Sequence, residues 1–159
     1  MIKYIKGDIL LSKVQLLAHG VAPNDHFDQG LALALRENWP GMYKDFRHYC
    51  QTAHPAPGTL WVWAGAQGTH IANLLTQEGA QEHGAKPGKA TVSHVNHCLR
   101  ELRKLIEAEG FDTVALPRLA TGVGGLDWQE VKPLIENHLG DLDATVYVYE
   151  TYVPGQAAA

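Results

Sequence analysis

Residues 113–128 read TVALPRLATGVGGLDW, and this stretch decides the fold. The apolar run Thr113–Leu116 is typical of a buried strand, and a helical pattern begins at Trp128. Ala120–Gly125 lies between them and carries three glycines in its last four positions. Glycines allow positive φ and a close approach of a ligand to the backbone, and consecutive amides can form a concave anion site. The segment matches neither GxGxxG nor GxxxxGKS/T, so it favours neither a dinucleotide-binding fold nor a P-loop.

Strand and helix patterns alternate on both sides of this stretch. Apolar or alternating runs predict further strands at Ile2–Ile5, Gln15–His19, Thr59–Ala64, His70–Leu75 and Ala144–Tyr149. Three- and four-residue spacing predicts helices at 90–109 and 128–139, and a helix pair that is broken at Pro40-Gly41. We therefore expect one α/β domain at residues 1–153, a three-layer α/β/α sandwich around a mixed, mostly parallel sheet, followed by a disordered tail at 154–159.

The composition excludes several classes of protein. The two distant cysteines, Cys50 and Cys98, are too few for a disulfide framework or a zinc site, so we expect free thiols and no metal. No stretch approaches the about 20 apolar residues that span a bilayer, and the start is not a charged-then-apolar signal, so we expect a cytoplasmic protein. A net charge of −4 argues against a duplex nucleic-acid binder. Backbone amides can still hold an anionic small ligand without any positive charge.

A second polar loop, Gly20–Gly30, follows the expected strand Gln15–His19 and opens a helix. Ligands of open α/β sheets lie beyond the carboxyl ends of the strands, which makes this loop and Ala120–Gly125 candidate site segments. The loop gathers four polar side chains near the free amides of a helix N-terminus, those of Asn24, Asp25, His26 and Asp28. Asp28 also fits the N-cap position, so a capping role and a functional role are both open at this point.

Together these segments resemble a macrodomain. Three stretches carry the resemblance: Ile2–Leu10 with its Gly-Asp-Ile, Leu17-Ala18-His19 followed by Gly30-Leu31-Ala32, and Pro117–Trp128 with its Gly-Gly-Leu-Asp-Trp. The chain is similar, from about Met1 to Tyr149, to the subgroup of terminal ADP-ribose glycohydrolases and of antitoxins that remove ADP-ribose from DNA. No single stretch is specific to that subgroup, but the combination is.

The resemblance implies an ADP-ribose site. Asp8 and Ile9 would hold adenine while Tyr149 stacks nearby, the Thr121–Leu126 amides would hold the diphosphate, and the Gly20–Gly30 loop would wrap the distal ribose. The expected ligand-binding residues are Asp8, Ile9, Gly20, Val21, Gly30, Leu31, Thr121, Gly122, Val123, Gly124, Gly125, Leu126 and Tyr149. The expected partner is ADP-ribose, or ADP-ribosylated protein or nucleic acid, with no cofactor and no membrane. We expect a monomer, and a toxin partner is left open.

The sequence differs from the subgroup at the positions of the subgroup's catalytic residues. Gln77 stands where the hydrolases carry a lysine that attacks the distal ribose, and an amide cannot form such an adduct. Gly124 stands where some members use an aspartate, Ala22 replaces an asparagine, and Asp28 replaces a usual glycine. Lys86 and Lys89 lie downstream, and we interpret them as a solvated loop and helix start rather than as replacements for the lysine.

These departures leave three functions. The leading hypothesis is an ADP-ribosyl hydrolase without the lysine, in which Asp28 or Asp25 positions or deprotonates water and His26 or His19 assists. A non-catalytic ADP-ribose reader is the second. A phosphatase acting on ADP-ribose-1''-phosphate is the third, because the yeast-type phosphatases of this fold also keep a histidine at the His19 position and lack the lysine.

Overall fold

The computed structural model describes residues 1–66, 68–80 and 86–158. Within them the strands are β1 (Ile2–Gly7), β2 (Leu16–Val21), β3 (Leu60–Ala64), β4 (His70–Leu75), β5 (Thr113–Pro117) and β6 (Thr145–Tyr152). The helices are the short 3-10 turn η1 (Ile9–Leu11), α1 (Gly30–Asn38), α2 (Pro40–Ala53), α3 (Val92–Glu109) and α4 (Trp128–Leu139). The strands and helices predicted from the sequence are present, with boundaries that shift by a few residues.

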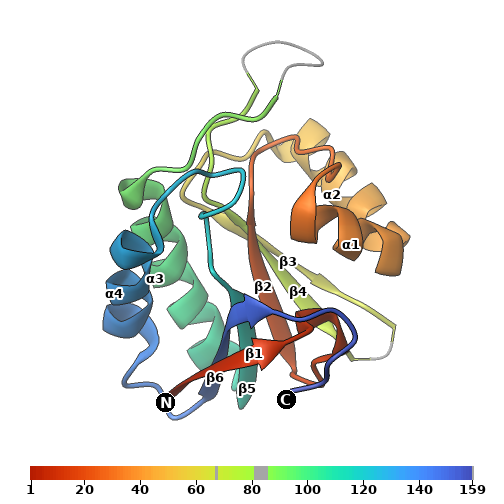
Figure 1. Cartoon of the computed structure of the whole chain (residues 1–159). Helices are drawn as coiled ribbons and strands as arrows, with labels where there is room; N and C mark the ends of the chain where they lie inside the picture. The colour runs from red at the N-terminus through yellow and green to blue at the C-terminus, as the bar shows by residue number, and fades with distance from the viewer. Residues whose placement is uncertain (67, 81–85, 159) are drawn as a thin grey trace.

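The strands form one sheet in the order β1-β6-β5-β2-β4-β3. Only β3 runs antiparallel, against β4, while the other pairs are parallel. Helices α1 and α2 cover one face of the sheet, and α3 and α4 cover the other (Figure 1). The prediction of a three-layer α/β/α sandwich with a mixed, mostly parallel sheet is confirmed.

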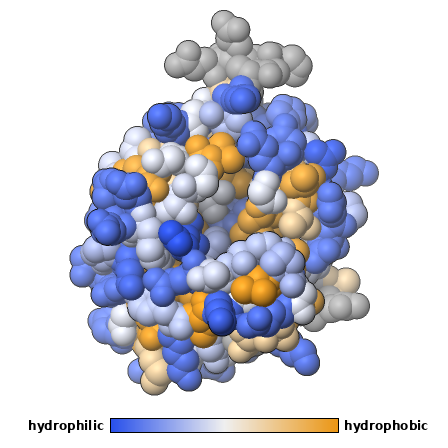
Figure 2. All heavy atoms as spheres, viewed as in Figure 1, coloured by the Kyte–Doolittle hydropathy of each residue, from blue (hydrophilic) through white to orange (hydrophobic). Residues whose placement is uncertain are grey.

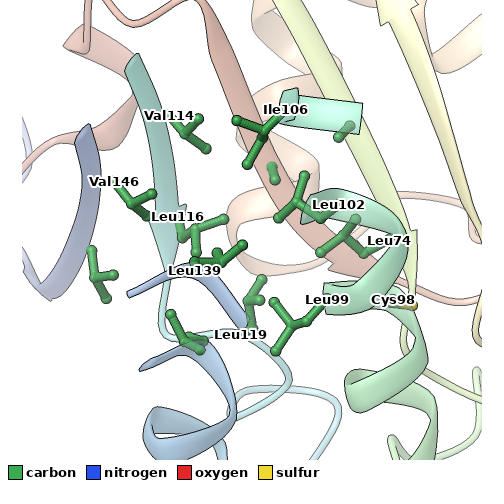
Figure 3. Close-up of a cluster of buried hydrophobic side chains, with 14 of the residues drawn as sticks. Leu74, Cys98, Leu99, Leu102, Ile106, Val114, Leu116, Leu119, Leu139 and Val146 are labelled. Atoms are coloured by element: carbon green, nitrogen blue, oxygen red, sulfur yellow. The ribbon is translucent and has the colours of Figure 1, made fainter. Parts of the chain in front are cut away.

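Each face of the sheet carries its own core. Alternate residues of β6 separate the two: Val146 and Val148 pack with α3 and α4, whereas Tyr147 and Tyr149 face η1, α1 and α2. Figure 3 shows the first core, in which leucines of α3 meet Leu116 of β5 and Leu139 of α4. Successive residues of a strand point to opposite faces of the sheet. Because odd- and even-numbered positions of these strands both carry apolar side chains, the sheet is buried on both sides.

Local signals fix the ends of the longest helix. The side chain of Thr91 accepts a hydrogen bond from the backbone of His94 at the start of α3, and Gly110 ends it in the left-handed region at φ 68°. Both were readable in the sequence, which is why the boundary predicted at Glu109 agrees with the structure.

The residues after β6 lie across the end of β1. The Asp8 amide donates to the Gln156 carbonyl at 2.7 Å, and the Gly155 amide donates to the Asp8 carboxylate at 3.0 Å. A β-carbon on Gly7 would lie 2.8 Å from Ala158, so the tail packs directly on this turn. No local pattern indicates these contacts, and the sequence analysis predicted a disordered tail at 154–159. The domain boundary at residue 153 stays a prediction.

Replacement of Leu99 by alanine tests the core between the sheet and α3. Leu99 is fully buried in this core, so we expect Leu99→Ala to lower the free energy of unfolding by about 2–5 kcal/mol, from lost transfer energy and a residual cavity. Val92→Ala is the control, because Val92 lies on the same helix and is 39% exposed. Its effect should stay within about 0.5 kcal/mol. Equal losses for both variants in urea unfolding would contradict the described core.

Candidate functional site

A cavity of about 270 Å³ lies between the loops that follow β2 and β5. Those loops leave the same end of the sheet (Figure 1), and Figure 2 shows hydrophilic and hydrophobic residues interleaved over the face seen in that view. The lining residues are His19, Gly20, Val21, Asp25, Asp28, Gln29, Gly30, Leu31, Ala32, Gln77, Pro87, Pro117, Arg118, Leu119, Ala120, Thr121, Gly122, Val123 and Gly124. Small-molecule sites measure about 300–1,000 Å³, so this cavity suits part of a larger ligand or one small ligand.

The loop after β5 presents unused backbone donors to the cavity. Within the described residues, the amides of Thr121 to Gly124 donate to no other group, and all four residues line the cavity. The amides of Gly125 and Leu126 are instead taken up inside the loop, by the carbonyls of Gly122 and Ala120 at 3.1 and 2.9 Å. The available donors are therefore a narrower set than the sequence predicted, and they form a concave patch suited to an anion.

This loop is tightly wound around Gly124. Ala120 adopts a left-handed conformation at φ 61°, which is uncommon for a residue other than glycine. A β-carbon on Gly124 would lie 2.7 Å from the Ala120 carbonyl oxygen, closer than two such atoms approach. The aspartate that some macrodomains carry here is therefore excluded by the backbone as well as absent from the sequence.

The loop after β2 is held by Asp25. Its carboxylate accepts hydrogen bonds from the amides of Ala22 at 3.1 Å and Phe27 at 2.8 Å. Burial raises the pKa of Asp25, and these two hydrogen bonds oppose the rise. Phe27 is fully buried with φ 52°, so the carboxylate stabilises a strained turn. Both oxygens of Asp25 are occupied, which assigns it a structural task in addition to its place in the cavity wall.

Asp28 is exposed and lines the cavity, but it does not cap the helix. The N-cap of α1 is Gln29, and no side-chain hydrogen bond is made there, so the predicted N-cap role of Asp28 is wrong. The Asp28 carboxylate therefore makes no capping hydrogen bond. The start of α1, which no side chain caps, lines the cavity through Gly30, Leu31 and Ala32. The first amides of a helix have no partner inside it and attract anions. His26 is exposed and outside the cavity lining, and its carbonyl accepts from Arg36.

His19 contributes a neutral ring to the cavity wall. It is only 2% exposed, and burial lowers the pKa of the imidazole to about 4 despite a hydrogen bond to Asn73. The two side chains meet at 2.6 Å, between Nε2 and Oδ1, and their residues are direct register partners in β2 and β4. The sequence analysis named His19 and missed Asn73. The sequence did contain a signal for the pair, because His19 and Asn73 are each a polar residue within an otherwise apolar strand.

Gln77 is a buried part of the wall. Its Nε2 donates to the Gly88 carbonyl at 3.1 Å, and its backbone bridges to Ala90. The side chain thus ties the end of β4 to the segment before α3. Lys86 and Lys89 are both exposed and do not line the cavity, while residues 81–85 between these segments lie outside the described residues.

The residues predicted to hold adenine lie outside the cavity lining. The Asp8 carboxylate accepts from Leu10 and from Gly155, both at 3.0 Å. Ile9 and Tyr149 share one apolar cluster, and Tyr149 is only 4% exposed. A base could stack on that ring only after its neighbours move. The role of these three residues stays a prediction.

Comparison with known proteins identifies the family. The family model described as Macro domain matches residues 22–135, which include the loop after β5 and most of the loop after β2. The chain belongs to the Macro domain family. Among solved structures, the macrodomain of Thermus aquaticus DarG superposes with a TM-score of 0.81 at 27% identity, covering 94% of this chain and 98% of that one.

Two curated relatives of this macrodomain carry different names. The DNA ADP-ribosyl glycohydrolase of Thermus aquaticus is 29% identical over 154 residues, which cover 94% of this chain and 41% of the relative. The ADP-ribose 1''-phosphate phosphatase of Scheffersomyces stipitis is 29% identical over 175 residues, which cover 93% and 99%. The chain thus spans about two fifths of the length of the DNA ADP-ribosyl glycohydrolase relatives it matches.

Neither a metal-binding cluster nor a membrane-spanning helix is found in the described parts of this macrodomain. No group of three or more histidine, cysteine, aspartate or glutamate residues there is arranged to hold a metal ion. In the same residues, no helix combines the length and the apolar character needed to cross a bilayer.

The winding of the glycine loop can be tested at two of its positions. We expect Gly124→Ala to destabilise the fold by about 1–3 kcal/mol, because the new methyl group collides with the Ala120 backbone. Gly122→Ala is the matched control, since nothing lies within 4 Å of its added β-carbon. Chemical unfolding of both variants measures the difference. If they lose the same stability, the close approach described here is wrong.

Proposed function

We propose that this macrodomain binds ADP-ribose and hydrolyses ADP-ribosyl linkages on protein or nucleic acid without a lysine nucleophile. One observation carries the proposal: two sets of free amides, at Thr121–Gly124 and at the start of α1, face a single cavity. Backbone amides at both walls suit a ligand with a diphosphate and neighbouring hydroxyl groups, and they require no basic surface. The names of the relatives support the same ligand.

Hydrolysis assigns a task to Asp28. Gln77 offers no amine, so covalent attack by that residue is ruled out chemically. In the proposed step a water molecule forms a bond to the anomeric carbon of the distal ribose, and the bond from that carbon to the target breaks. The Asp28 carboxylate accepts a proton from the water, and the leaving group takes up a proton from solvent. Asp25 is less suited to be this base because both of its oxygens already hold the loop.

A second function, phosphate removal from ADP-ribose-1''-phosphate, has its own support. The phosphatase relative aligns over 99% of its length, whereas the DNA ADP-ribosyl glycohydrolase relatives extend far beyond the matched region. A third, a reader that binds without turnover, is favoured by the absence of the lysine and of the loop aspartate. We further propose a monomer, and a toxin as partner, since one relative is named as a transferase–glycohydrolase fusion.

Three assays on the wild-type chain separate these functions. Calorimetric titration with ADP-ribose should show one-to-one binding, and mono-ADP-ribosylated DNA or protein should release ADP-ribose. Inorganic phosphate liberated from ADP-ribose-1''-phosphate would indicate the phosphatase instead. Binding without either release would indicate the reader. Failure to bind ADP-ribose would refute the proposal as a whole.

The Asp28→Ala variant tests the assigned base. We expect ADP-ribose affinity to persist and the release rate to fall by about 10²–10⁴-fold, as for loss of a general base. Asp45→Ala serves as the control, since Asp45 lies on α2, bonds to Trp63 and is not among the lining residues. Undiminished release by Asp28→Ala would remove that residue from the mechanism.

A further inference from the structure

The His19–Asn73 pair lies where polar side chains are least expected, on two adjacent strands in the middle of the sheet. Asn73 is fully buried, and its register partner His19 lines the cavity. A buried polar group is costly unless it is hydrogen-bonded, so a pair in this position indicates a specific task. Neither proposed mechanism needs Asn73 to touch a ligand.

The orientation of the Asn73 amide is fixed from its other side. Its Nδ2 donates to the Trp61 carbonyl at 3.4 Å, which directs Oδ1 to Nε2 of His19 at 2.6 Å. If the Asn73 side-chain amide were flipped, its Oδ1 would lie against the carbonyl oxygen of Trp61, and two acceptors would face each other. Because Oδ1 can only accept a hydrogen bond, Nε2 of His19 must carry the proton.

A neutral imidazole has one N–H, so the other nitrogen, Nδ1, carries a lone pair. Burial keeps the ring neutral near pH 7, since it lowers the pKa of His19 to about 4. The ring packs on that of Phe27 in a T-shaped arrangement, with 5.5 Å between the ring centroids and an interplanar angle of 82°, which limits its rotation. Among the described residues, Nδ1 has no hydrogen-bond partner.

We propose that Asn73 is a positioning residue that holds His19 with its proton on Nε2, so that Nδ1 presents the cavity with a hydrogen-bond acceptor. The cavity wall also offers N–H donors, at Thr121–Gly124 and at the start of α1, together with the carboxylates of Asp25 and Asp28. A phosphate oxygen is itself an acceptor and is repelled by the Nδ1 lone pair, whereas a hydroxyl group donates to it. The pair therefore directs a sugar hydroxyl or a bound water toward β2 and leaves the phosphates to the amides.

The inference rests on the proposed function only for the identity of the ligand. The tautomer itself is a property of the free protein and can be read by ¹⁵N NMR of the imidazole nitrogens near pH 7. We expect the Nε2–H form for His19 in the wild-type chain. An Nδ1–H form there would overturn the proposal before any variant is made.

A matched pair within the chain provides the control. His138 and Asn96 join α4 to α3 with the same 2.6 Å separation between Nε2 and Oδ1, and neither residue lines the cavity. We expect Asn73→Leu to abolish the single Nε2–H signature of His19 and to raise the Kd for ADP-ribose by about 2- to 10-fold, the effect of one hydrogen bond. Asn96→Leu should change neither.

Asn73→Asp is the second variant, in case leucine disrupts the sheet. Its carboxylate still accepts from Nε2, so both the tautomer and the affinity should return toward those of the wild type. An unchanged His19 signature in Asn73→Leu, or equal affinity losses in Asn73→Leu and Asn96→Leu, would overturn the positioning role. A wild-type chain that shows the Nε2–H form but binds no ADP-ribose would instead refute the proposed function.

Discussion

The parallel pairing of β2 with both β4 and β5 is the constraint on which the rest of the structure depends. Parallel strands bring their carboxyl ends to one edge of the sheet, so the chain leaves all three strands at the same place. The glycine loop after β5, the polar loop after β2 and Gln77 after β4 become neighbours for this reason, although they are separated by scores of residues. The cavity is a consequence of that pairing, and the start of α1 completes its wall.

The charge of the protein and the chemistry of the cavity are consistent once the backbone is considered. A chain with a net charge of −4 is a poor candidate for binding anions through side chains. The free amides of Thr121–Gly124 and of the α1 start provide donors whose partial charges do not depend on basic residues. His19 adds an acceptor beside these donors, because burial keeps its ring neutral. In the proposed binding mode the amides hold the phosphates and His19 accepts from a hydroxyl group, which would orient a ligand that has both.

The two carboxylates of the first loop have different surroundings in the fold. Asp25 holds the strained turn around Phe27 with both of its oxygens. Asp28 makes no capping contact and lines the cavity with its carboxylate exposed. In sequence the two aspartates were equivalent candidates, three residues apart. They differ only because the fold turns the amides of Ala22 and Phe27 toward one of them.

By itself the sequence determined the order of the elements, the sandwich architecture and the two loops that form the cavity, because hydrophobic period and turn residues are local signals. It also determined that the lysine of similar hydrolases is absent, since the residue at position 77 is a glutamine whatever the fold. Only the tertiary structure decided which groups are free. The loss of the Gly125 and Leu126 amides depends on how the glycine loop winds on itself. The contact of residues 155–156 with Asp8 and the His19–Asn73 pair depend on atoms that are distant in the chain. No local pattern encodes such contacts, because each is set by the register and packing of the whole sheet.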